Sequence, residues 1–199
     1  MSSTPNDSST IDVAAAAAKA QADINAASRN ADPERADLLA MLARGRHFLR
    51  FTARDLTDEQ AARRTTASEL CLGGLIKHVA AVEDHWARFI TDGPSPAADF
   101  SAMTPEDFAR RADQFRLLPG ETLQGVLDEY AGVAARTDEV VRTVPDLGMS
   151  HPLPKAPWNP PGESWSARHV VMHIIAETAQ HSGHADIIRE SLDGAKTMG

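Results

Sequence analysis

The sequence predicts an all-α fold, a four-helix bundle with long crossover connections. Four long segments repeat their apolar residues at helical spacing. No segment shows the two-residue alternation that is typical of a half-buried strand. Amphipathic helices of this kind bury their apolar stripes against one another in a bundle. A chain of 199 residues is long enough to bury one such core.

Residues 1–31 are expected to lie outside the bundle. They are rich in Ser, Asn and Asp and then in Ala, with very few large apolar side chains. Such a segment has helix propensity but cannot bury a face. We therefore expect a mobile tail or a loosely docked helix, followed by one bundle domain over residues 32–199.

The first long helix is predicted within residues 31–56. Asp32 can cap this helix, and Pro33 suits its first position. A short helix follows, because Thr57 and Gln60 have the spacing of a capping box.

The second long helix is predicted over residues 68–90, where the apolar residues form a heptad-like stripe. The sequence Asp-Gly-Pro at 92–94 ends it. A short capped helix over 104–115 lies on the connection to the third long helix. The third helix follows the Pro-Gly turn at 119–120 and keeps its apolar spacing as far as Val144.

The segment 145–165 breaks the helical pattern. It contains six prolines, Trp158 and Trp165, and it has no periodicity. A loop of this length in a compact domain is usually functional or disordered, and the two tryptophans indicate that it packs against another part of the chain. The fourth long helix is predicted over residues 166–194, with Gly194 as its stop.

Composition and charge exclude several classes of function. The formal net charge is −8 at pH 7, whereas a protein that binds nucleic acid through phosphates needs a basic stripe. No apolar run approaches the roughly 20 residues that span a bilayer, and the N-terminus lacks a secretory signal pattern. The single cysteine, Cys71, excludes an intrachain disulfide and a cysteine-based zinc knuckle. We expect a soluble cytoplasmic protein that binds neither nucleic acid nor membrane.

Polar residues interrupt the predicted apolar faces of two helices. On the fourth helix, Glu177 and His181 are four residues apart and share a face. On the second helix, His78 stands between Leu75 and Val82, so it faces the core. The apolar stripe that Glu177 and His181 interrupt consists of Val170, Val171, Ile174, Ile175, Ile187, Ile188 and Leu192.

Three donors that face one point can bind a metal ion. Buried charge is costly unless it is paired or bound to a metal, and bundle cores build metal sites from facing helices. His78, Glu177 and His181 would leave at least one coordination position open, as catalytic zinc sites do. The same ligands suit Ni²⁺, Fe²⁺ or Mn²⁺. The alternative is that His78 is a hydrogen-bonded core residue and that the other two lie on a solvated helix face.

Three other residues are weaker candidates for this site. His173 lies four residues before Glu177 and is a rival ligand. His85 follows His78 by seven residues, so it either neighbours the ligands or is only polar. Cys71 precedes His78 by seven residues and either points to the same pocket or is an inert core residue.

His184 and Asp186 lie further along the fourth helix. Either they orient the ligands by hydrogen bonds, or they form surface pairs with Arg189. Both interpretations are open from the sequence.

The blocks that carry these residues resemble a known family. "LCLGGLIKHVAAVEDHW" and "SWSARHVVMHIIAETAQHSGHADIIRE" are similar to the DinB-like superfamily of metal-binding four-helix bundles. They look most like the branch of the mycothiol-dependent S-transferases and maleylpyruvate isomerase. The resemblance covers about residues 33–194 and includes the loop sequence "LPKAPWNPPGE".

The resemblance implies a metal-binding triad. The usual triad of the superfamily is one histidine on the second helix and two histidines, four residues apart, on the fourth. His78 and His181 match two of these positions, and Glu177 takes the place of the remaining histidine. This set is similar to the His/Glu/His set of the isomerase branch. The resemblance also implies a divalent ion, Zn²⁺ first of all, and a homodimer.

The chemistry that fits such a site is thiol activation. A coordinated divalent ion removes the proton of a thiol at neutral pH and leaves the nucleophilic thiolate. We expect mycothiol, or another small thiol, to attack an electrophile or to add reversibly to an activated alkene. A metal-dependent hydrolase, in which the ion activates water, and a non-catalytic metal- or ligand-binding stress protein are the alternatives. The loop 145–165 would be a pocket wall, a lid or a plain crossover connection.

Overall fold

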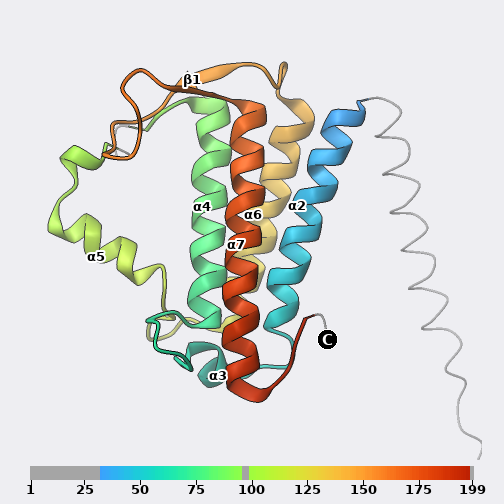
Figure 1. Cartoon of the computed structure of the whole chain (residues 1–199), viewed down its shortest axis with the longest axis vertical. Coiled ribbons are helices and arrows are strands. Elements are labelled where there is room, and N and C mark those ends of the chain that lie inside the picture. Colours follow the sequence, from blue (N-terminus) through green and yellow to red (C-terminus); the bar gives the residue numbers. More distant parts are fainter. Residues whose placement is uncertain (1–31, 96–98, 198–199) are drawn as a thin grey trace, which may run out of the picture. The chain divides into compact units, whose positions relative to one another are not determined.

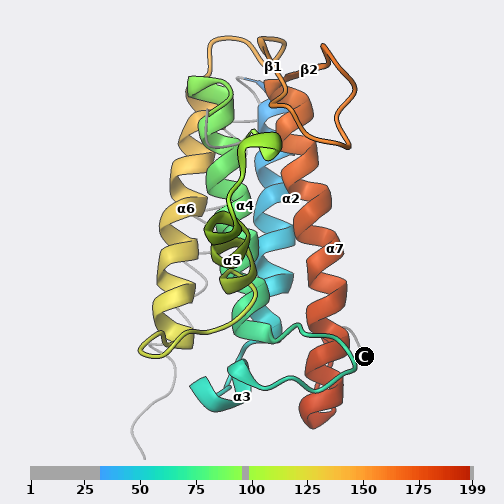
Figure 2. The same ribbon diagram turned by 90° about the vertical axis from the view of Figure 1, so that its left-hand side faces the viewer.

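The structure is a computed structural model that describes residues 32–95 and 99–197. The described chain is mostly helical and contains one small two-stranded sheet (Figures 1 and 2), in agreement with the predicted all-α class. The expected tail over residues 1–31 lies outside the described residues. No helix in the described ranges is long and apolar enough to cross a membrane.

The chain divides into two compact units, Met1–Ala40 and Met41–Gly199. The candidate site residues all lie in the second unit. The elements in chain order are α2 (Pro33–Thr52), α3 (Asp58–Ala62), α4 (Leu72–Asp92), η2 (Phe100–Ala102), α5 (Pro105–Asp113), α6 (Leu123–Thr143), β1 (Ser150–Pro152), β2 (Ser164–Ser166) and α7 (Ala167–Asp193).

Local signals set the ends of these helices. Thr57 and Thr104 accept hydrogen bonds from the backbone N–H of the third helical residue, and so cap α3 and α5 as predicted. Gly93 and Gly194 follow the last residues of α4 and α7 with φ values of 78° and 80°. Glycine adopts these angles without steric cost, so both helices stop where the sequence predicts.

The strands β1 and β2 form an antiparallel pair that was not predicted from the sequence. Ser150 pairs with Ser166, and His151 pairs with Trp165. Each strand has only three residues, which is too short to show an alternating pattern. The pair closes the loop between residues 152 and 164 and holds Trp165 just before α7.

Within the second unit, α4 packs along both α6 and α7 (Figure 1). One apolar core takes residues from all the long helices, including Leu49, Leu75, Val126 and Ile188. The predicted core position of Ile187 is wrong, because its side chain is 61% exposed. Successive residues on a helix point in different directions, and Ile188 takes the inward position.

A buried ion network crosses this core. The guanidinium of Arg46 on α2 donates to both carboxylate oxygens of Glu83 on α4, and to Asp138 on α6 at 2.7 Å. Arg46 is 6% exposed and Glu83 is 0% exposed. Three helical segments of the second unit are therefore joined by charge as well as by apolar contact.

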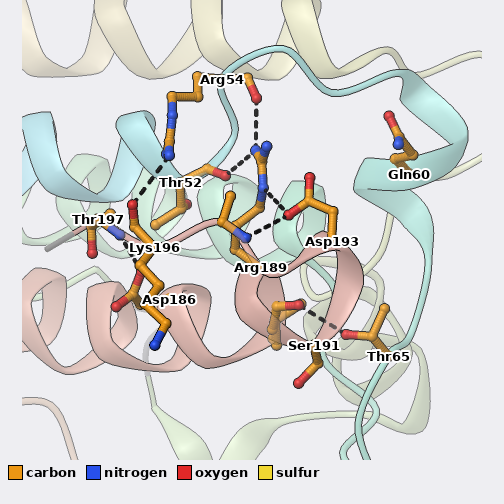
Figure 3. Close-up of polar contacts among 12 residues, drawn as sticks. Thr52, Arg54, Gln60, Thr65, Asp186, Arg189, Ser191, Asp193, Lys196 and Thr197 are labelled. Atoms are coloured by element: carbon orange, nitrogen blue, oxygen red, sulfur yellow. Dashed lines mark hydrogen bonds and ion pairs between the residues drawn. The ribbon is translucent and has the colours of Figure 1, made fainter. Parts of the chain in front are cut away.

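Arg189 ties the C-terminal end of α7 to the turn after α2 (Figure 3). Its guanidinium donates to the backbone oxygens of Thr52 and Arg54 at 2.8 and 2.6 Å. Its Nε donates to Asp193 at 2.9 Å. The side chain is buried, so these bonds fix the end of the helix that carries Glu177.

Candidate metal centre

The three predicted ligands lie together between α4 and α7. His78, Glu177 and His181 each offer one ligand atom, and these atoms lie within 4.8 Å of one another. Nε2 of His181 is 3.6 Å from Oε2 of Glu177. The rings of His78 and His181 meet edge to face, with their centroids 4.9 Å apart. One small cation between the helices could reach all three donors.

The surroundings of His78 fit the role of a metal ligand. Its Nδ1 is buried and has no hydrogen-bond partner among the described residues. Burial, and next the charge of His181, lower the pKa of His78 to about 4. The imidazole is therefore neutral at pH 7, and a neutral imidazole has the lone pair that binds a metal.

The segment that follows α5 covers one face of the His78 ring. The ring of Phe115 stacks on His78 with centroids 4.1 Å apart. Gly74 permits this approach, because a Cβ atom there would overlap the backbone carbonyl of Phe115. Sγ of Cys71 donates to the same carbonyl oxygen at 3.7 Å. Cys71 is buried and outside the donor cluster, which favours its interpretation as a core residue.

The two donors that α7 supplies are partly exposed. The side chains of Glu177 and His181 are 29% and 12% exposed. His173 lies beside the other carboxylate oxygen, with its Nε2 3.9 Å from Oε1 of Glu177. The cluster within 4.8 Å contains His78 and not His173, so the rival ligand stands next to the carboxylate rather than with the three donors.

A comparison with known families identifies the family of the chain. The family model of the mycothiol-S-transferases matches residues 37–194. The chain belongs to this family. The match confirms the DinB-like branch that the two helical blocks resemble.

The crystal structure of a conserved protein from Enterococcus faecalis is also similar. It has a TM-score of 0.55 and 19% sequence identity, and the match covers 79% of this chain and 96% of that chain. At this identity the similarity concerns the fold alone. No curated protein matches the chain significantly.

In this member of the mycothiol-S-transferase family, an aromatic stack of Trp86, Trp165 and His169 lies beside the donor cluster. Trp165 stacks on Trp86 at 4.9 Å between centroids and on His169 at 4.3 Å. The ring of His173 lies 5.0 Å from each of the two tryptophans. The loop 145–165 therefore packs against α4 and α7 through Trp165, as its tryptophans indicated, whereas Trp158 is 64% exposed.

The residues beyond His181 have different roles. Nδ1 of His184 lies 3.4 Å from Nδ1 of His181, so one ring can donate to the other and orient it. The carboxylate of Asp186 accepts from the backbone N–H of Thr197 (Figure 3). The predicted surface pairs of His184 and Asp186 with Arg189 are wrong. Arg189 donates instead to the carboxylate of Asp193 and to the backbone oxygens of Thr52 and Arg54.

Two neighbours of the donor cluster could not be assigned from the sequence. Phe115 follows a short helix on an aperiodic connection, and the one signal for it is the Gly-Gly pair at 73–74, which indicates a close backbone approach. Trp86 belongs to the apolar stripe of α4, but its partner Trp165 comes from a strand that no pattern reveals. His85 is exposed and lies outside the donor cluster.

Proposed function

We propose that this protein is a metal-dependent thiol S-transferase that uses mycothiol. His78, Glu177 and His181 would hold a divalent ion, Zn²⁺ first of all, inside a four-helix bundle of α2, α4, α6 and α7. The observation that carries the proposal is the convergence of two imidazoles and one carboxylate within 4.8 Å in a chain of the mycothiol-S-transferase family. The homodimer and the cytoplasmic location expected from the sequence remain predictions.

The ion, when bound, would hold a coordinated thiol as its thiolate at neutral pH. In the transfer, the thiol proton goes to solvent, a bond forms from sulfur to the electrophile, and the leaving group departs with its electron pair. The protein supplies a neutral, half-buried His78 as a ligand. Phe115 excludes water from the outer side of that ring.

The residues around Glu177 would orient the carboxylate and admit the substrates. His173 and His181 lie on opposite oxygens of this carboxylate, and the aromatic stack holds His173 in place. Because Glu177 and His181 are partly exposed, a thiol and an electrophile could approach from the α7 side.

Metal analysis of purified protein tests the site. We expect one divalent ion per chain in the wild type and loss of that ion in His78→Ala and His181→Ala. His47→Ala is the matched control, because His47 is an exposed histidine on α2. Retention of the ion by both ligand variants would contradict the proposed centre.

Activity of the metal-loaded protein tests the reaction. We expect conjugation of an electrophile such as a haloarene or a bromobimane only when mycothiol is supplied. Turnover of an ester without any thiol would show that the site activates water. One bound ion without turnover across a panel of thiols and esters would indicate a binding protein.

A further inference from the structure

The residues that directly follow α5 pack on the first turns of α4. A Cβ atom at Gly73 would lie 2.7 Å from the side chain of Leu117, and one at Gly74 would overlap the carbonyl of Phe115. The two glycines therefore let this segment approach the helix backbone closely. Gly74 precedes His78 by four residues, so the segment lies on the face of α4 that carries His78.

Two side chains of this segment reach the ring of His78. The ring of Phe115 stacks on it, with centroids 4.1 Å apart and an angle of 25° between the planes. The side-chain amide of Gln114 forms a hydrogen bond with the imidazole. Neither residue belongs to α4 or α7, the helices that supply the three donors. The stack fixes the plane of the ring, and the hydrogen bond favours one of its two flips within that plane.

The hydrogen bond also determines which nitrogen of His78 carries the proton. Nδ1 is buried and has no hydrogen-bond partner among the described residues, so the bond to Gln114 falls to Nε2. A neutral imidazole has one N–H and one lone pair. With the proton on Nε2, that N–H donates to the amide oxygen of Gln114, and Nδ1 keeps a free lone pair. With the proton on Nδ1, a buried N–H would have no acceptor, and an unsatisfied buried donor is costly.

We infer that Gln114 is a positioning residue of the candidate metal centre, which holds His78 in the tautomer with the proton on Nε2 and leaves Nδ1 free for the ion. This inference rests on the proposed function, because Nδ1 becomes a ligand only if the three donors bind one ion. It adds a residue from the connection between α5 and α6 to a centre whose donors lie on α4 and α7.

The arrangement prepares the ligand before the ion arrives. A lone pair that bonds no other group of the protein is available to a metal without the loss of a hydrogen bond. The bond that the other ring nitrogen makes sets the tautomer and the orientation of a metal-binding histidine. Gln114 supplies that bond, and Phe115 prevents the ring from tilting away. The segment after α5 therefore belongs to the centre as a support of His78.

The tautomer of His78 can be measured in the metal-free protein. Long-range proton–nitrogen NMR of protein with isotope-labelled histidine separates protonated from unprotonated ring nitrogens, and the signals of His78 are those lost in His78→Gln. At neutral pH we expect the proton on Nε2 in the wild type. Gln114→Met keeps the length of the side chain without the amide and should give a mixture of tautomers. Gln114→Glu keeps an acceptor oxygen and should keep the wild-type tautomer.

The affinity for Zn²⁺ measures the consequence for the metal centre. Competition with a chromophoric chelator should give a Kd about tenfold higher in Gln114→Met than in the wild type, as when an outer hydrogen-bonding partner is lost. Gln114→Glu should bind at least as tightly as the wild type. Gln124→Met is the matched control, since Gln124 is an exposed glutamine of α6, and its Kd should stay at the wild-type value.

Two results would overturn the inference: a proton on Nδ1 of His78 in the wild type, or equal Kd values in the wild type and Gln114→Met. Methionine has nearly the shape of glutamine, so a role in packing alone would leave the Kd of this variant unchanged. Absence of an ion from the wild type, together with a His78 tautomer that depends on Gln114, would overturn the proposed function and not the role of Gln114.

Discussion

Arg46 on α2 donates to both carboxylate oxygens of Glu83 on α4, at 3.2 and 2.6 Å, in the interior of the protein. Two charges removed from water are costly, and their attraction offsets this only while both partners are present. Asp138 gives the guanidinium a second carboxylate from α6. The network therefore restricts how α2, α4 and α6 can align.

Removal of one partner should show this dependence. We expect Glu83→Gln to lower the free energy of unfolding by about 3 kcal/mol, because the buried guanidinium loses its closest countercharge. Urea unfolding measures the change. Glu139→Gln on α6 is the control; its side chain is exposed, and a change within about 0.5 kcal/mol is expected. Equal effects of the two variants would contradict a structural role for the buried pair.

Two helical glycines should respond to alanine in opposite directions. At Gly74 a Cβ atom would overlap the backbone of Phe115, so we expect Gly74→Ala to destabilise the protein by about 1–3 kcal/mol. At Gly183 no atom outside its own helix turn lies within 4 Å of an added Cβ. Gly183→Ala should therefore stabilise α7 by about 0.5–1 kcal/mol. Thermal unfolding distinguishes them, and a Gly74→Ala protein as stable as the wild type would refute the close approach.

A bound divalent ion should stabilise the folded protein through His78, Glu177 and His181. At a free Zn²⁺ concentration of 100 times Kd, the free energy of unfolding should rise by about 2.7 kcal/mol. A chelator should reverse the rise, and His181→Ala should show almost none of it. Calorimetric unfolding with and without Zn²⁺ measures the effect. The same increase in His181→Ala would place the ion elsewhere.

The aromatic stack should influence metal affinity from a distance. Trp165→Leu removes the ring that holds His173 beside Glu177, so we expect metal affinity to fall about tenfold, as when an outer hydrogen-bonding partner is lost. Competition with a chromophoric chelator measures Kd. Trp158→Leu is the control, because Trp158 is exposed on the same loop. Similar affinities of the two variants would count against the coupling.

The helices could be predicted from the sequence because their signals are local. A capping threonine before α3 and α5, and a glycine after α4 and α7, act within one turn of the residues they affect. The convergence of His78 with Glu177 and His181 was predictable for a related reason, since each interrupts an apolar stripe and the stripes of packed helices face each other.

Features that depend on contacts between distant segments were not predictable. Glu83 looks like any surface acid in its helix, and only the position of Arg46 in the core explains its burial. Trp165 pairs with His151 across strands of three residues each, which leave no pattern to read. Ile187 fits a helical stripe as well as Ile188 does, and the choice between them depends on the tilt of α7 against its neighbours.

The stacked pair of Trp86 and Trp165 gives the molecule an optical reporter of its own. The chain has three tryptophans, and two of them lie together beside His173. Intrinsic fluorescence therefore arises largely next to Glu177, with Trp158 as a solvent-exposed background. A quenching ion such as Co²⁺, or a chromophoric electrophile, would change this emission on arrival. Loading and turnover could then be followed in real time in unlabelled protein.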